Sequence, residues 1–139
     1  MNVYLNFDGN CRAAIEFYCE VFGAEVEVLQ TFGDAPGDMP VAPDHADRVM
    51  HCTLRIGDGQ LMASDRFPGR EDDHVVGNNF AINVPVADRE AAETLFPKLA
   101  AGGEVQMPLA ETFWGSLFGI CRDPFGVDWM VNVDLRSTS

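Results

Sequence analysis

The stretch GNCRAAIEFYCEVFG, residues 9–23, decides how the first half of the chain is interpreted. Its apolar residues recur at intervals of three and four, which is the spacing of an amphipathic helix. They are Ala14, Ile15, Tyr18, Val21 and Phe22. Asn10 is a predicted N-cap, and Gly23 is suited to end the helix in the left-handed conformation. We therefore expect a helix over residues 11–22 with one buried stripe.

Alternating apolar and polar residues on either side of this helix predict strands. Residues 2–7 form the expected strand before the helix, and residues 24–32 form the one after it. Two more strands, residues 48–56 and 60–65, are joined by the hairpin turn Gly57-Asp58-Gly59. The first half therefore predicts the order β-α-β-β-β, with a long Pro- and Asp-rich loop at residues 33–46.

The second half repeats this order. Residues 79–84 predict a strand, Asp88 an N-cap, and Gly102-Gly103 the end of a helix. Three further strands are expected at residues 104–108, 116–122 and 127–133. Asp123-Pro124-Phe125-Gly126 has the residue types of a β-turn.

A shift of 79 residues superposes the two halves. It places Ala13 on Ala92, Phe17 on Phe96 and Gly23 on Gly102. We predict an α+β fold of two βαβββ modules, residues 1–66 and 78–135, with a linker at 67–77. A small sheet with one helix cannot close a core alone, so the modules should pair, within or between chains. The expected result is a curled mixed sheet around a cup, with the helices outside.

The net charge of the chain limits the classes of partner that it is expected to bind. Among 139 residues there are 22 acidic and 9 basic side chains, for a net charge of −13, and Lys98 is the single lysine. Nucleic acids and anionic membrane surfaces are bound through Lys and Arg, so neither is an expected partner. No apolar segment reaches transmembrane length, and residues 1–6 do not have the basic-then-apolar pattern of a leader, so we expect neither a membrane span nor a secretory signal. Its four cysteines form no CxxC pair, which favours reduced thiols and a cytoplasmic protein.

Three predicted strands carry one apolar face and one mixed face. The mixed faces hold the candidate ligand-binding residues, which are His51, Thr53, Arg55, Asn79, Asn83, Met130 and Asn132. If the sheet curls, these faces line a concave site for a small molecule. The alternative is that they are ordinary solvent-facing sides of an antiparallel sheet.

Two sequence blocks together resemble a known superfamily. They are residues 9–23 and the run from Phe113-Trp114-Gly115 through Gly119 to DPFGVDW, residues 123–129. Their order is similar to that of the vicinal-oxygen-chelate superfamily, which includes glyoxalase I, extradiol dioxygenases and bleomycin-resistance proteins. The second block looks like the PhnB-like branch, and the match spans about residues 3–133. This resemblance implies paired modules around a cup, and usually a homodimer.

The resemblance also identifies four positions at which the metal-using enzymes carry ligands. They fall on Val3, His51, Asn79 and Met130. Only His51 is a good ligand for a divalent ion, and one strong ligand does not hold such an ion. We therefore expect a metal-free cup with no cofactor. A metal-dependent lyase or dioxygenase is the alternative. The methyltransferase label of some PhnB-like proteins fits poorly, because no G-x-G-x-x-G loop is present.

Three of the candidate residues each have a functional and a structural interpretation. His51 is the candidate for proton transfer or hydrogen bonding in the cup, or a structural strand histidine. Trp114 forms an aromatic wall for an apolar or planar ligand, or packs in a core or dimer contact. Arg55 binds an anionic ligand, or lies in solvent.

Three functions follow from these interpretations. The chain is a small-molecule binding module, an enzyme that uses His51, or a structural or regulatory dimer whose cup is filled by its own side chains.

Overall fold

The structure is a computed structural model that describes residues 2–34, 46–66 and 74–137. The chain divides into two compact units, Met1–Val75 and Val76–Ser139, here called the first and second unit. Most of the predicted linker, residues 67–73, and most of the predicted loop at 33–46 lie outside the described residues.

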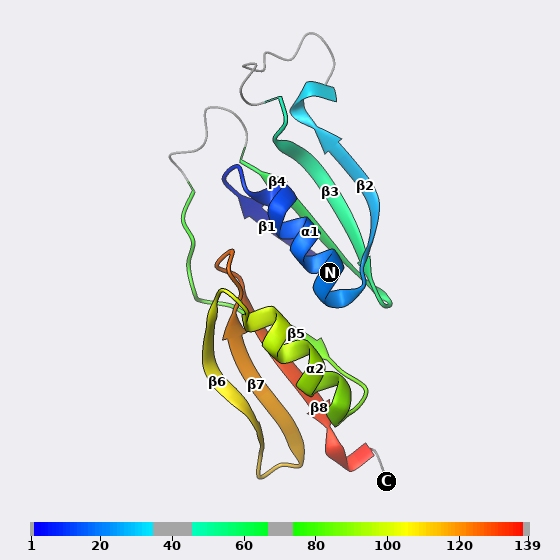
Figure 1. The fold of residues 1–139 in the computed structure, drawn as a ribbon, viewed down its shortest axis with the longest axis vertical. Coiled ribbons are helices and arrows are strands. Elements are labelled where there is room, and N and C mark those ends of the chain that lie inside the picture. Colours follow the sequence, from blue (N-terminus) through cyan, green and yellow to red (C-terminus); the bar gives the residue numbers. More distant parts are fainter. Residues whose placement is uncertain (1, 35–45, 67–73, 138–139) are drawn as a thin grey trace. The chain divides into compact units, whose positions relative to one another are not determined.

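The first unit is a four-stranded mixed sheet with one helix. Its elements are β1 (Val3–Phe7), α1 (Cys11–Phe22), β2 (Glu25–Thr31), the 3-10 turn η1 (Phe32–Asp34), β3 (Val49–Ile56) and β4 (Gly59–Asp65). The strand order is β1-β4-β3-β2. β1 runs parallel to β4, and the other neighbours are antiparallel. Helix α1, blue in Figure 1, lies over one side of this sheet.

The second unit repeats the same topology. Its elements are β5 (Ile82–Pro85), α2 (Arg89–Ala100), β6 (Glu104–Glu111), β7 (Ser116–Arg122), β8 (Asp128–Asp134) and the 3-10 turn η4 (Leu135–Ser137). The order β5-β8-β7-β6 matches that of the first unit, again with one parallel pair, β5 and β8 (Figure 1). The predicted α+β fold of two βαβββ modules is therefore confirmed.

Each helix packs on its own sheet through one stripe of side chains. α1 buries Cys11, Ala14, Ile15 and Tyr18, and α2 buries Ala92, Phe96 and Leu99. At Gly119 of β7, an added Cβ would lie only 3.0 Å from a ring carbon of Phe96. A glycine there lets the aromatic ring of α2 rest directly on the strand.

Asn10 occupies the predicted N-cap position of α1, and its backbone oxygen accepts from Ala14 N–H at 3.1 Å. Asn10 makes no capping hydrogen bond with its side chain. Instead the buried carboxylate of Asp65, at the end of β4, accepts hydrogen bonds at Oδ1 from the backbone N–H groups of Gly9 (2.8 Å) and Cys11 (3.0 Å). Its Oδ2 accepts one from Val49 N–H at 2.8 Å. A residue distant in sequence thus satisfies the free N–H groups at the helix start.

The local predictions for the turns and the second helix hold. The backbone N–H of Ala91 donates to the Asp88 side chain at the start of α2. Gly23 follows α1 with a φ of 65°, in the left-handed region. In the predicted turn, the Asp123 side chain accepts from the N–H groups of Phe125 and Val127 and from the indole of Trp129.

Two details of the predicted repeat need correction. Helices α1 and α2 begin 78 residues apart, at Cys11 and Arg89, and the same shift pairs the buried Ala14 with Ala92. The predicted shift of 79 pairs Ala92 with the exposed Ala13, so it does not hold within the helices. It does relate the flanking strands, since β1 and β5 begin 79 residues apart, and so do β2 and β6. The strand predicted at 79–84 is also displaced, because β5 begins at Ile82.

Candidate functional site

Each sheet has one side against its own helix and one side facing away from it. In the first unit the paired residues Leu5, Ala63 and Cys52 are buried on the α1 side. Alternation places the next residues, such as Tyr4, on the opposite side, here called the first open face. Its residues are Tyr4, Asn6, Val28, Gln30, His51, Thr53, Arg55, Gln60, Met62 and Ser64.

A hydrogen-bonded chain of three side chains crosses the middle of the first open face. The Tyr4 hydroxyl lies 3.3 Å from Nδ1 of His51, and the two ring centroids are 5.8 Å apart. Nε2 of His51 lies 3.0 Å from Oγ1 of Thr53. Thr53 is only 9% exposed, whereas Tyr4 is 43% exposed. Both ring nitrogens of His51 are therefore occupied by hydroxyl groups, and the outermost group of the chain is a phenol.

The hairpin end of the first open face is charged but paired. Nη2 and Nε of Arg55 donate to Oε2 of Glu27 at 2.8 and 3.3 Å, and Gln60 donates to Oε1 at 3.0 Å. The hydrogen bonds from Arg55 and Gln60 hold the pKa of Glu27 below its usual value. The guanidinium thus already has an anionic partner, which weakens the prediction that Arg55 binds an anionic ligand.

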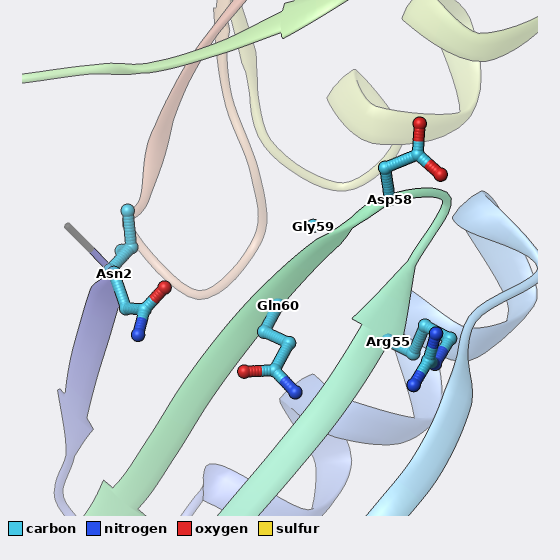
Figure 2. Close-up of a pocket in the computed structure, with 6 residues that line it drawn as sticks. Asn2, Arg55, Asp58, Gly59 and Gln60 are labelled. Atoms are coloured by element: carbon cyan, nitrogen blue, oxygen red, sulfur yellow. The ribbon is translucent and has the colours of Figure 1, made fainter.

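An open hollow of about 500 Å³ adjoins this ion pair (Figure 2). It is lined by Asn2, Val3, Arg55, Asp58, Gly59 and Gln60. Figure 2 shows Gln60 and Arg55 on neighbouring strands, with Asp58 at the hairpin turn and Asn2 near the start of β1. Its lining is mainly polar, so it suits the polar part of a ligand better than an apolar body.

Two of the predicted site residues lie away from the open faces. Val3 falls on the same side of β1 as the buried Leu5 and Phe7, the side that faces α1. Asn79 is exposed and precedes β5. Tyr4, which the sequence analysis did not single out, occupies the place expected of Val3. The apolar alternation of Leu5 and Phe7 was the signal that could have identified it.

The second unit has an equivalent side that faces away from α2, here called the second open face. Its residues are Asn83, Pro85, Met107, Ala110, Phe118, Ile120, Arg122, Asp128, Met130 and Asn132. Three of the predicted residues, Asn83, Met130 and Asn132, therefore share one face. At its hairpin end, Nε of Arg122 donates to Oδ1 of Asp128 at 2.8 Å, so both open faces carry an arginine–carboxylate pair there.

The second open face is mainly apolar and aromatic. The ring of Trp114 lies 6.5 Å from that of Phe118 and is 49% exposed. Phe118 pairs across the strands with Asn132, and Ile120 pairs with Met130. Oδ1 of Asn132 is buried and has no hydrogen-bond partner within the described part of the chain. Trp114 therefore lies beside this face, at the same end as Asn132.

Neither the cysteines nor the carboxylates form a metal centre in the described ranges. No group of three or more His, Cys, Asp or Glu side chains gathers there closely enough to hold an ion. All four cysteines are free thiols. Burial raises the pKa of Cys52 to about 11, and that of Cys121 likewise to about 11. These thiols stay protonated near neutral pH, so they are poor nucleophiles and poor ligands.

Comparison with known proteins agrees with this architecture. Protein YjdN of Escherichia coli is 33% identical over 144 residues, covering 96% of this chain and 94% of that protein. The crystal structure of protein PA1353 from Pseudomonas aeruginosa is 38% identical with a TM-score of 0.78, covering 96% and 98% of the two chains. A PhnB protein from Bacillus cereus, 24% identical with a TM-score of 0.72 and the same coverage, shares the fold.

A family model covers nearly the whole chain and agrees with the resemblance found in the sequence. It matches residues 1–131 and describes the Glyoxalase/Bleomycin resistance protein/Dioxygenase superfamily. The chain therefore belongs to the glyoxalase/bleomycin resistance protein/dioxygenase superfamily.

Proposed function

We propose that this protein binds a small organic molecule against its open faces and uses no resident metal. The observation that carries the proposal is the second open face. There, Phe118 pairs across the strands with Asn132, and the ring of Trp114 lies 6.5 Å from that of Phe118. Met130 precedes Asn132 by two residues along β8, and the buried carbonyl oxygen of Asn132 has no partner in the described residues. Apolar surface with a few directed polar groups is characteristic of small-molecule sites.

The aromatic residues favour a ligand with a planar apolar part. Trp114 leaves about half of its surface exposed, at 49%. Covering a large apolar side chain of this kind contributes roughly 1.5–3 kcal/mol, and aromatic stacking adds to it. The thioether of Met130 adapts to rings of different shape. A donor on such a ligand would supply the hydrogen bond that the Asn132 oxygen lacks.

The charge distribution favours a neutral or cationic ligand. Arg55 and Arg122, the arginines of the two open faces, are bound to Glu27 and Asp128. The net charge of −13 repels anions at long range. The polar contacts of the first open face, Tyr4 and His51, are uncharged when the imidazole is neutral.

The metal-dependent alternative does not fit the residues present. Of the four positions that carry ligands in the metal-using enzymes, Val3 lies on the α1 side of its strand and Asn79 precedes β5. His51 has hydroxyl groups at both ring nitrogens. Met130 offers a soft thioether, which suits a hard cation poorly. These four positions therefore do not supply the ligand set that a metal-dependent lyase or dioxygenase needs.

We further propose a homodimer in a reducing, cytoplasmic environment. The edge strands β2 and β6 expose Val26, Val28, Val105 and Met107, each between 40% and 48%. Exposed apolar groups of this kind support an association surface.

The four free thiols support a reducing compartment. No helix within the described ranges is long and apolar enough to cross a bilayer.

Native mass spectrometry of freshly purified protein tests these points together. We expect the mass of a dimer, a retained or added small aromatic molecule, and no stoichiometric divalent ion. The Phe118→Ala variant should lose the small molecule, whereas Val105→Ala on the edge strand should keep it. A stoichiometric metal would overturn the metal-free assignment. A dimer to which no member of a library of planar aromatic amines and amides binds would favour the structural alternative.

A further inference from the structure

The first open face contains a series of hydrogen-bonded groups whose chemistry goes beyond binding. It runs from the nearly buried Thr53 through the half-buried His51 to the exposed Tyr4. An arrangement of an exposed hydroxyl, a base and a third group that orients the base is the general pattern of activated hydroxyls in enzymes. We propose that Tyr4 is an acid–base group that exchanges protons with a substrate and that His51 relays them.

The occupied ring nitrogens of His51 carry this inference. Nδ1 lies 3.3 Å from the Tyr4 hydroxyl and Nε2 lies 3.0 Å from the Thr53 hydroxyl. No ring nitrogen is left for a substrate, so a proton reaches the imidazole only through one of the two hydroxyls. Thr53 is 9% exposed and Tyr4 is 43% exposed, which makes Tyr4 the outlet.

The direction of the hydrogen bonds that link Tyr4, His51 and Thr53 follows from the strength of the donors. A neutral imidazole donates from one nitrogen and accepts at the other. A phenol is a stronger donor than an aliphatic hydroxyl, so Tyr4 donates to Nδ1 and Nε2–H donates to Oγ1 of Thr53. Thr53 is thus a positioning residue that fixes the tautomer of His51. This leaves the Tyr4 oxygen with a free lone pair toward the open face.

The transfer step balances without a further reactant. A substrate X–H bond breaks and its electron pair stays on X, while the Tyr4 oxygen takes the proton. The original phenol proton passes to Nδ1, which gives an imidazolium whose Nε2–H is still held by Thr53. Return of a proton to another atom of the substrate completes an isomerisation. The substrate class is a small molecule with an acidic hydrogen, such as one on carbon next to a carbonyl.

Neighbouring groups suit a neutral organic substrate at this point. Met62 pairs across the strands with both Tyr4 and Thr53, and Val28 pairs with Thr53. The hydrogen-bonded series of Tyr4, His51 and Thr53 therefore has apolar side chains beside it on the neighbouring strands. The ion pair of Arg55 lies two residues from Thr53 along β3. The inference rests on the proposed function only because the substrate must reach this face.

Benzenesulfonyl fluoride tests the activated phenol without knowledge of the substrate. It forms a sulfur–oxygen bond with a phenol as the sulfur–fluorine bond breaks, so fluoride leaves and the phenol proton passes to a base. Peptide mapping by mass spectrometry gives the rate at Tyr4, with the fully buried Tyr18 as internal control. We expect His51→Gln to slow labelling of Tyr4 roughly tenfold or more, as loss of a general base does.

His74→Gln is the matched control, because Nε2 of His74 lies 3.0 Å from the backbone oxygen of Asn6 and His74 is not a member of the Tyr4–His51–Thr53 series. It should leave the labelling rate unchanged. An equal rate in wild type and His51→Gln, or no labelling of Tyr4 in wild type, would overturn the inference. Labelling needs no bound ligand, so a failure of the binding proposal leaves this result intact.

Nitrogen-15 NMR of the wild-type protein provides a second test that needs no variant of His51. The ring signals should show a protonated Nε2 and an unprotonated Nδ1. Thr53→Val should shift the population toward the other tautomer, a change that a merely structural role of Thr53 would not produce. The opposite tautomer in wild type would contradict the proton path.

Discussion

The two open faces of this protein share one layout but differ in chemistry. Both lie opposite the helix of their unit, and both have an arginine–carboxylate pair at the hairpin end. Between those ends the first face presents hydroxyl and imidazole groups, Tyr4, His51 and Thr53. The second face presents Phe118, Ile120 and Met130 instead. Two units of the same topology thus present one mainly polar and one mainly apolar open face.

This difference explains why the frame was easier to predict than the site. The helix-facing sides need only apolar residues at the right period, and both units satisfy that requirement with different residues. The open faces are not constrained by packing against a helix of their own unit. Their residues are therefore free to serve binding or proton transfer, and function is best sought there.

The largest expected difference between the two units lies in their buried carboxylates. Asp65 joins three distant backbone N–H groups, whereas Asp123 binds groups within six residues of itself. Asp65→Ala leaves three donors without a partner, so it should lower the free energy of unfolding by about 4 kcal/mol. Urea denaturation measures the loss. Hydrogen exchange should show it first in α1, because Asp65 caps that helix.

Asp123→Ala should lower the free energy of unfolding by about 3 kcal/mol, because it also leaves three donors without their acceptor. The loss is smaller than for Asp65 because these donors all lie in or next to one local turn. The exposed Asp47 provides a control, and Asp47→Ala should change stability little. If Asp65→Ala and Asp47→Ala were equally stable, the assignment of Asp65 as the cap of α1 would be wrong.

The sequence contained enough information for the elements but not for such long-range contacts. Helix stripes, the Asp88 cap and the Asp123 turn are encoded within a few residues and were predicted. The capping of α1 by Asp65 joins residues 54 and 56 positions apart, which no local pattern reveals. The sequence therefore identified the N-cap position, Asn10, but not the distant carboxylate that binds the N–H groups there.

The candidate site was also predicted only where a local pattern determines the position of a side chain. Alternation correctly placed His51, Thr53 and Arg55 on one side of β3, and Met130 and Asn132 on one side of β8. The carry-over to Val3 missed the open face by one residue, because a single-residue slip moves a side chain to the other side of a strand. Tyr4 and Glu27, which bind His51 and Arg55, come from other strands, so identifying them required the register of the sheet.

The helix-facing sides of the two sheets should have the same pH dependence of stability, in contrast to the open faces, which differ in chemistry. Cys52 and Cys121 each have a pKa raised by burial from 9.0 to about 11. Between these values the unfolded chain releases the thiol proton while the folded chain keeps it, so stability falls as pH rises. Each thiol should account for on the order of 2 kcal/mol lost by about pH 10.5.

Urea denaturation at about pH 8 and pH 10.5 measures this loss in wild type and in the two alanine variants. Cys52→Ala and Cys121→Ala should each flatten the pH dependence by a similar amount. A full wild-type dependence in both variants would show that these thiols do not have raised pKa values in the folded protein.

The difference between the open faces gives the smallest but most specific prediction. Nile red, a neutral planar dye, should bind the second open face in preference to the first. Phe118→Ala removes an aromatic wall and should weaken binding about tenfold, which corresponds to about 1.4 kcal/mol. Thr53→Val removes only a hydroxyl from the first face and should leave the affinity unchanged. Fluorescence titration measures both variants. Equal weakening by both variants would contradict the assignment of the dye to the second open face, and the distinction between a polar and an apolar face would then have to be abandoned.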